Sequence, residues 1–197
     1  MKKTLVFASN NQNKADEIRR ILGEGFQIIT LKEAGIDVDI PEPHESFHLN
    51  ALEKSRYIFN QTGFDCFSED SGLEVRSLHG APGVRSARYA GEKASDMENI
   101  EKLLKELKEQ NDRIANFKTV ISLILGGEEY FFEGVCMGKI SHTMKGKNGF
   151  GYDPVFIPDG SEISFAEMSM DEKSVFSHRK KAVKKMTAFL EQLKSNT

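Results

Sequence analysis

A short apolar strand, Thr4–Ala8, runs directly into a polar segment whose side chains could hold an anion. The segment carries hydroxyl, amide and amine groups, on Ser9, Asn10, Asn11, Gln12, Asn13 and Lys14. Groups of these types at a helix N-terminus are typical of phosphate binding. The glycines and the Gly-Lys-Ser/Thr ending of a P-loop are absent from the segment. Because the same residue types cap ordinary helices, the alternative is a plain strand–helix turn.

Two further cations fall on the apolar faces of predicted helices. A helix over residues 46–61 has the apolar stripe Phe47, Ala51, Ser55, Ile58 and Phe59. Lys54 lies inside this stripe and Asn50 at its edge, whereas Glu53 and Arg56 point away. A last helix over residues 171–194 has the stripe Val175, Ala182, Val183, Met186, Leu190 and Leu193.

Arg179 lies in the middle of the second stripe, and His178 lies at its edge. A charge on a buried face must be paired or must line a polar pocket, because burying it alone is costly. The alternative is that each long side chain keeps its charged end in water. Together with Lys14, the inward Lys54 and Arg179 favour an anion pocket.

An acidic cluster accompanies these cations. Glu69 and Asp70 follow a predicted strand around Phe67, and they point to opposite sides if the chain is extended. Glu42 lies in a proline-rich loop just before the helix that carries Lys54. Carboxylates beside a phosphate pocket indicate Mg²⁺, which prefers oxygen ligands. The alternative is a solvated acidic turn.

The segment 149–154, Gly-Phe-Gly-Tyr-Asp-Pro, could form a slot for a nucleobase. Glycines allow close approach of the backbone, and Phe150 could stack on a base. Asp153 could accept hydrogen bonds from ring N–H groups. The alternative is a turn with Phe150 packed in the core.

The composition is that of a globular protein without a basic surplus. The chain has 197 residues, of which 39% are hydrophobic and 29% are charged, and its net charge is −3. This balance argues against wrapping a nucleic acid backbone. Cys66 and Cys136 each lie in an apolar run, which favours a reducing cytoplasm over a disulfide framework. We find no signal peptide and no long apolar span, so the sequence does not indicate export or a membrane protein.

Strands and helices alternate at both ends of the chain around a predicted antiparallel hairpin. The hairpin consists of residues 117–125 and 130–140 and turns at Gly126-Gly127. This order predicts an α/β fold with a mixed twisted sheet flanked by helices. We expect a single domain over residues 1–197, formed by two lobes with the active site in the cleft between them.

Together these motifs resemble the inosine triphosphate pyrophosphatase family, also called dITP/XTP pyrophosphatases. The resemblance runs in order through nearly the whole chain. Its motifs are Ser9-Asn10-Asn11-x-x-Lys14, Glu42, Phe47-x-x-Asn50-Ala51-x-x-Lys54, Glu69-Asp70-Ser71-Gly72-Leu73, the segment 80–91, Gly149–Pro154, Glu172-Lys173-Ser174 and Ser177-His178-Arg179. Each motif is short, but so many in this order are highly specific.

The resemblance implies hydrolysis of ITP, dITP and XTP to the monophosphate and pyrophosphate, with Mg²⁺ and usually as a homodimer. It implies a metal site of Glu42, Glu69 and Asp70, with Asp70 as the base on the attacking water. The residues that it implies for substrate binding are Ser9, Asn10, Asn11, Gln12, Asn13, Lys14, Lys54, Ser71, Phe150, Gly151, Tyr152, Asp153, Lys173, His178 and Arg179.

Two departures and two alternatives accompany this resemblance. The family often has Glu-Thr-Gly where this chain has Glu42-Pro43-His44, and many bacterial members have Asp where this chain has Glu69. The first departure alters the loop around a predicted metal ligand. The alternatives are a pyrophosphatase for other modified nucleotides and a non-catalytic nucleotide sensor. A sensor would not need the three carboxylates that the chain keeps.

Overall fold

The computed structural model describes residues 3–22, 25–38 and 40–195, and the chain divides into two compact units. The first unit contains the chain up to Asp70, Thr119–Gly134 and the chain from Arg179 onward. The second unit contains Ser71–Lys118 and Val135–His178. Within the described residues, no helix has the length and apolar character needed to cross a membrane.

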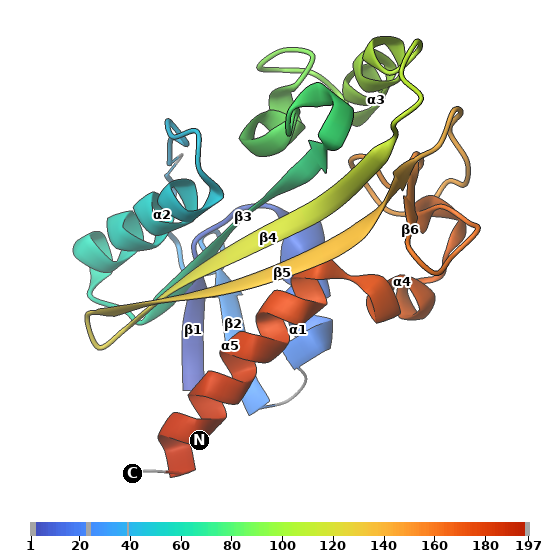
Figure 1. Cartoon of the computed structure of the whole chain (residues 1–197). Helices are drawn as coiled ribbons and strands as arrows, with labels where there is room; N and C mark the ends of the chain where they lie inside the picture. The colour runs from blue at the N-terminus through green and yellow to red at the C-terminus, as the bar shows by residue number, and fades with distance from the viewer. Residues whose placement is uncertain (1–2, 23–24, 39, 196–197) are drawn as a thin grey trace. The chain divides into compact units, whose positions relative to one another are not determined.

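A mixed sheet provides the framework. The strands are β1 (Lys3–Phe7), β2 (Phe26–Thr30), β3 (Cys66–Val75), β4 (Ile114–Leu125), β5 (Glu128–Ile140) and β6 (Phe156–Pro158). They follow the order β2-β1-β3-β4-β5-β6 (Figure 1). Strand β1 pairs in parallel with β2 and β3, whereas β5 and β6 are antiparallel. The prediction of an α/β fold with a mixed sheet is therefore confirmed, while the cleft and the single domain stay predictions.

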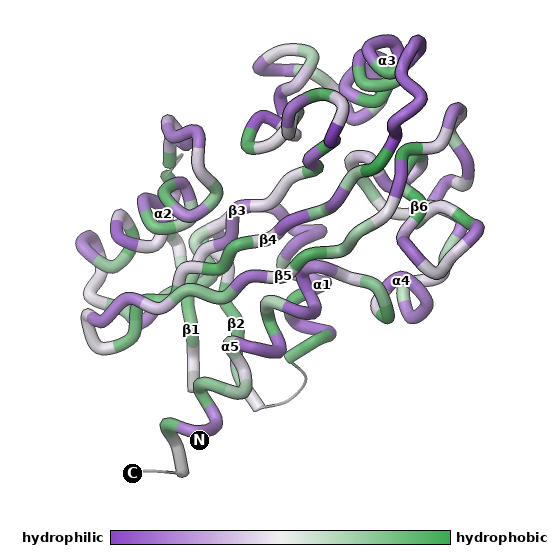
Figure 2. Tube along the Cα trace, in the orientation of Figure 1, coloured by the Kyte–Doolittle hydropathy of each residue, from purple (hydrophilic) through white to green (hydrophobic). Residues whose placement is uncertain are grey.

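Side chains alternate between two cores along the strands of the first unit. Leu5 and Phe7 of β1 pack with the helices α1 (Gln12–Leu22) and α5 (His178–Ser195). Val6 and Ala8 face the opposite way and pack with α2 (Phe47–Thr62). Because successive side chains of a strand point to opposite faces, helices cover both faces of these strands. Figure 2 shows β1 as mostly hydrophobic and α5 as alternately hydrophilic and hydrophobic, as expected for a helix that covers one face.

Local signals explain where the elements of the first unit begin and end. The side chain of Ser46 accepts a hydrogen bond from the N–H of Leu49 and so caps α2. The helix ends at Gly63, whose φ of 68° is left-handed. Gly126 and Gly127 have φ values of 59° and 89°, which suit the two-residue turn between β4 and β5. The predicted hairpin is thus confirmed.

The second unit has its own core, built from the ends of β3, β4 and β5 that lie in this unit, together with short helices. The helices are α3 (Asp96–Glu106), α4 (Met170–Phe176) and the 3₁₀ segments Arg76–Leu78, Gly83–Arg88 and Phe165–Glu167. Leu103, Phe117 and Phe156 are among its buried side chains. The rings of Phe117 and Phe156 meet edge to face, with their centroids 4.7 Å apart.

Two predicted elements differ from the structure. The strand predicted around Phe67 does not end before Glu69 but continues through Asp70 to Val75 as β3. The single last helix expected over residues 171–194 is two helices, because Ser177 leaves helical geometry with ψ of 120°. Val175 consequently lies on α4 and is 72% exposed, so its place in the apolar stripe was wrong. Ala182, Val183, Met186 and Leu190 are buried as predicted, whereas Leu193 is 37% exposed, so its place in the stripe was wrong too.

Candidate active site

The strand β3 carries two buried carboxylates at the end of the first unit. Glu69 is 1% exposed and Asp70 is 4% exposed. Cations and acids from other elements of the same unit surround them. We call this set the strand-end cluster, because Asp70 is the last residue of β3 in the first unit: Lys14, Glu17, Glu42, Asn50, Lys54, Glu69, Asp70 and Arg179.

Glu69 is held by two cations. Arg179 donates from Nε and Nη2 to the two carboxylate oxygens, at 2.8 and 3.0 Å. Lys14 Nζ lies 3.1 Å from Oε1. Burial acts to raise the pKa of Glu69, but Arg179 and Lys14 outweigh it, so the pKa lies well below its ordinary value. Glu69 is therefore a fixed anion at neutral pH.

Asp70 has a different environment although it is the next residue. Its Oδ2 accepts a hydrogen bond from Asn50 Nδ2 at 3.2 Å, and its Oδ1 lies 3.6 Å from Lys54 Nζ. Burial raises the pKa of Asp70, and Glu42 adds to the rise while Lys54 opposes it. A carboxylate with a raised pKa is better suited to accept a proton than one that is tightly paired. Glu69 and Asp70 lie in the strand β3, so the chain is extended here as the expectation of opposite sides required, and the two acids have different partners.

Lys54 links three parts of the strand-end cluster. Its ammonium donates to the backbone oxygen of Glu69 at 2.7 Å and pairs with the carboxylates of Glu42 and Asp70. Lys54 is 7% exposed, so its charged end is buried and the alternative of a side chain reaching to water is wrong. The structure thus brings together Glu42, Lys54 and Asp70, three of the residues that the resemblance implies for the site, while their roles stay predictions.

Asn50 and Glu17 complete the strand-end cluster. Asn50 donates to the backbone oxygen of His44 at 2.9 Å as well as to Asp70, and it accepts from the N–H of His44 at 2.9 Å. Glu17 of α1 pairs with Arg179 Nη1 and is 8% exposed. Glu17 was not among the residues predicted for the site. The signal was available, because Glu17 lies about 40° from Ile21 at the edge of the apolar face of α1.

The polar segment after β1 leads into α1, which begins at Gln12. Asn11 caps the helix, since its Oδ1 accepts from the N–H of Lys14 at 3.1 Å. Ser9 Oγ accepts from the N–H of Asn11 at 3.1 Å. Asn10, Asn11, Gln12 and Asn13 are exposed. The segment therefore has a capping role, and its exposed donors stay available as a predicted phosphate site.

The predicted base slot lies in the second unit and is tightly organised around Asp153. Its Oδ2 accepts from the N–H of Phe150 at 3.0 Å and from Lys173 Nζ at 2.6 Å. Lys173 Nζ also lies 5.1 Å from the centre of the Phe150 ring. Tyr152 Oη donates to the backbone oxygen of Ser86 at 2.8 Å. We call Phe150, Gly151, Tyr152, Asp153 and Lys173 the loop cluster.

Ser71 and His178 are the remaining predicted residues of the second unit. Ser71 follows Asp70 in β3 and is half-buried. His178 is buried, and its ring stacks on the ring of Phe117. The ring centroids are 4.9 Å apart and the interplanar angle is 9°. The predicted substrate role of each stays a prediction.

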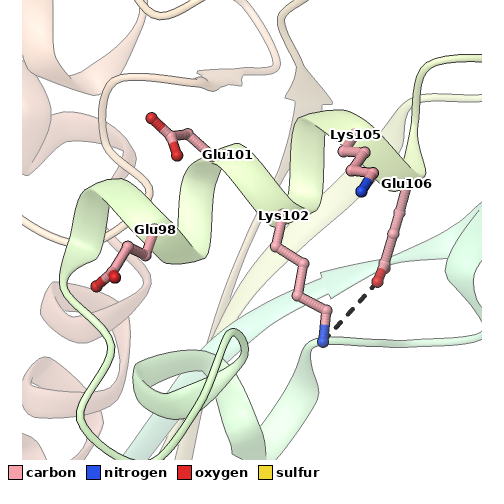
Figure 3. Close-up of a pocket in the computed structure, with 5 residues that line it drawn as sticks. All are labelled: Glu98, Glu101, Lys102, Lys105 and Glu106. Carbon is pink, nitrogen blue, oxygen red and sulfur yellow. Dashed lines mark ion pairs between the residues drawn. The ribbon is translucent and has the colours of Figure 1, made fainter.

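A surface hollow of about 610 Å³ lies on α3 and contains none of the predicted residues. Figure 3 shows its five lining side chains, Glu98, Glu101, Lys102, Lys105 and Glu106. Lys102 and Glu106 form an ion pair at 3.9 Å. The lining comes from one helix and consists of charges of both signs, so it provides no apolar wall for a base.

The carboxylates can be tested for their fit to Mg²⁺. Among residues 3–22, 25–38 and 40–195, no three His, Cys, Asp or Glu side chains converge as a metal site. Mg²⁺ is usually held by only one or two carboxylates together with substrate phosphates. Glu42 and Asp70 fit this donor set, because both pair with Lys54 and the charge of Glu42 acts on Asp70. Both oxygens of Glu69 accept from Arg179, which suits a metal ligand less well.

Comparison with known proteins decides the family. The model of the Ham1 family matches residues 5–189, nearly the whole chain. The chain belongs to the Ham1 family. It is 48% identical to a dITP/XTP pyrophosphatase of Christiangramia forsetii, over 94% of this chain and 98% of that protein. It is 46% identical to a dITP/XTP pyrophosphatase of Flavobacterium psychrophilum, over 94% and 97%.

Solved Ham1 structures share the fold. The Ham1 protein of Staphylococcus aureus matches with a TM-score of 0.88 and 40% identity, covering 96% of this chain and 99% of that one. A HAM1 protein from Coxiella burnetii matches with a TM-score of 0.89 and 36% identity, with the same coverage. The resemblance inferred from the motifs is thereby confirmed, and the α/β fold with its six-stranded sheet is the Ham1 fold.

Proposed function

We propose that this protein hydrolyses dITP, ITP and XTP to the nucleoside monophosphate and pyrophosphate. Its membership of the Ham1 family and its identity to relatives named dITP/XTP pyrophosphatase support this activity. The protein is a nucleoside triphosphate pyrophosphohydrolase. Removal of non-standard purine triphosphates cleans the nucleotide pool.

The observation that carries the proposal is the pair of adjacent buried acids with different partners: Glu69 accepts from Arg179, whereas Asp70 accepts from Asn50. Asp70, whose pKa is raised, takes the proton from the attacking water as general base. Glu69, whose pKa is lowered, stays ionised and holds Arg179 and Lys14 in place. In many enzymes, two neighbouring carboxyl groups whose environments give them different pKa values take different acid–base roles.

The cations of the strand-end cluster bind the triphosphate in this proposal. Lys14 and Lys54 neutralise phosphate oxygens, and the half-buried Ser9 together with the exposed donors of Asn10–Asn13 extends the binding surface at the start of α1. Ser71, the residue after the general base, makes a further substrate contact. Arg179 acts here chiefly through Glu69, since its guanidinium donates to Glu69 and Glu17.

Mg²⁺ fits as the metal, held by Glu42 and Asp70. When bound, it would neutralise charge on the phosphate oxygens. Glu69 is the third predicted ligand, and its role in the strand-end cluster is to position cations. The Mg²⁺ affinities of Glu42→Gln, Glu69→Gln and Asp70→Asn would show which of the three predicted ligands bind the metal.

The loop cluster selects the base. Phe150 stacks on the purine, and Gly151, Tyr152 and Asp153 shape the slot, with Lys173 and His178 as further contacts. Support comes from the geometry around Asp153, which pairs with Lys173 and anchors the N–H of Phe150. A slot whose polar groups are buried and already fixed can reject a base that leaves one of them unpaired.

We further propose that the protein works as a homodimer in the cytoplasm. The resemblance to the family supports the dimer, and the buried thiols of Cys66 and Cys136 suit a reducing compartment. Burial raises the pKa of the Cys66 thiol to about 12, which keeps it unreactive. Sedimentation of the purified protein over a range of concentrations tests the dimer.

The experiment that tests the function is a substrate panel with Mg²⁺. ITP, dITP, XTP, GTP, ATP and modified pyrimidine triphosphates are each incubated with the protein, and pyrophosphate release is measured. Preferential release from ITP, dITP and XTP supports the proposal. Preference for a modified pyrimidine would favour the related pyrophosphatase, and binding without release would favour the sensor.

A further inference from the structure

The loop Gly149–Asp153 has an unusual backbone that must be held in place. Gly149 and Gly151 have left-handed φ values of 79° and 58°. A Cβ at Gly149 would lie 2.0 Å from Oδ2 of Asp153, so the loop closes directly onto this carboxylate. The N–H of Phe150 points to Asp153, but the N–H of Gly151 does not.

The N–H of Gly151 instead donates to a carboxylate from a distant part of the sequence. Its partner is Oδ2 of Asp96, at 2.6 Å. Both residues belong to the second unit. A hydrogen bond from a backbone N–H to a carboxylate is charge-assisted and stronger than one between neutral groups. Asp96 therefore holds the middle of the loop from outside it.

The carboxylate of Asp96 is not needed to cap α3, although the residue lies at the start of that helix. It is the first residue of α3, where an acid commonly caps the helix or interacts with its dipole. Here Ser95 and Glu98 form a complete capping box, in which Ser95 Oγ accepts from the N–H of Glu98 and Glu98 accepts from the N–H of Ser95. The carboxylate of Asp96 is directed to the loop.

The helix that carries Asp96 is itself fixed to a neighbouring segment. Asn99 is buried, donates to the backbone oxygen of Ala87 at 3.1 Å and accepts from the N–H of Ala90 at 2.7 Å. The same segment meets the loop again, because Ser86 accepts from Tyr152 Oη. A closed circuit of hydrogen bonds thus joins α3, residues 86–90 and the loop.

We propose that Asp96 is a positioning residue that holds the Gly149–Asp153 loop and thereby maintains the preference for the non-standard base. Asp96 acts through the N–H of Gly151 and touches no substrate. The proposal rests on the proposed function, because it assigns the loop to base selection. It adds a residue from a helix that carries no part of the predicted site.

Three variants test this role. Asp96→Ala removes the acceptor, whereas Asp96→Asn keeps an acceptor oxygen and removes only the charge. Glu101→Ala is the matched control, since Glu101 is an exposed acid of the same helix on its charged outer face (Figure 3). Melting temperatures are recorded for all three, so that loss of the loop contact is separated from loss of the helix.

The first readout is kcat/KM for ITP divided by kcat/KM for ATP. We expect Asp96→Ala to lower this ratio about fivefold, the effect of about one hydrogen bond, mainly through the KM for ITP. Asp96→Asn should keep most of the ratio, and Glu101→Ala should leave it unchanged. An unchanged ratio in Asp96→Ala, or an equal fall in Glu101→Ala, overturns the proposal.

The second readout is hydrogen exchange in the peptide that contains residues 149–153, which needs no substrate. Asp96→Ala should speed exchange in this peptide, and Glu101→Ala should not. If the wild type failed to hydrolyse ITP, the proposed function would fall, whereas the exchange result would still decide whether Asp96 holds the loop. Unchanged exchange in Asp96→Ala refutes the anchor whatever the activity.

Discussion

The strand-end cluster and the loop cluster both contain a buried lysine paired with an aspartate, but the pairs have different neighbours. Lys54 in the first cluster contacts Glu42, Asp70 and the backbone of Glu69, so several charges share one cation. Lys173 in the second cluster pairs with Asp153, and this acid also holds the backbone of Phe150. In the first cluster one cation balances several acids, whereas in the second cluster the ion pair fixes the backbone of a loop. This difference indicates that bond cleavage and base choice are separable by mutation.

The largest expected effect follows from removing the base of the strand-end cluster. Asp70→Asn should lower kcat for ITP by about 100-fold or more, because an amide cannot accept the proton from water. Steady-state pyrophosphate release measures the loss. Asp159→Asn, at an exposed acid of the second unit, is the control. Turnover by Asp70→Asn at the wild-type rate would remove Asp70 from its role as base.

The corresponding change in the loop cluster should alter base choice. Asp153→Asn leaves Lys173 buried without its partner carboxylate, so it should also lower the melting temperature. The double variant Asp153→Asn with Lys173→Met removes both charges, and it should recover stability. We expect the double variant to lower the ratio of kcat/KM for ITP over ATP about tenfold. Recovery of the ratio together with stability would show that the pair is only structural.

A smaller effect concerns pH. Lys54 opposes the rise in the pKa of Asp70, so Lys54→Met should raise that pKa further. The base must be ionised to act, and the acid limb of the kcat/KM profile for ITP should therefore move to higher pH. Arg56→Met is the control, because Arg56 is exposed on the same helix and pairs with Glu129. Coincident acid limbs for Lys54→Met and wild type would contradict the electrostatic link.

The smallest effect concerns stability. The pKa of Asp70 is higher in the folded protein than in the unfolded chain, so its contribution is favourable at low pH and is lost as pH rises through the folded pKa. At neutral pH the ionised carboxylate is therefore unfavourable. Asp70→Asn should have an equal or higher melting temperature at pH 7 than wild type. A clear fall would mean that Lys54 and Asn50 stabilise the ionised form more than burial opposes it.

The sequence predicted those features that depend on local period and residue type. A spacing of about 100° per residue placed Lys54 and Arg179 on inward faces, and both are buried. It could not give their partners, which come from distant segments: Arg179 pairs with Glu17, and Gly151 donates to Asp96. The sequence also did not predict that the last helix is interrupted at Ser177. No glycine or proline marks this position, and the interruption lies only in the backbone angles of the serine.

The central claim is that the strand-end cluster cleaves the triphosphate while the loop cluster selects the base. Its most direct test is kcat/KM for ITP and for ATP, measured in wild type, in Asp70→Asn and in the double variant Asp153→Asn with Lys173→Met. The account predicts that Asp70→Asn lowers both values by the same factor and leaves their ratio intact, whereas the double variant lowers chiefly the value for ITP. A changed ratio in Asp70→Asn, together with an equal fall for both substrates in the double variant, would contradict the division of roles.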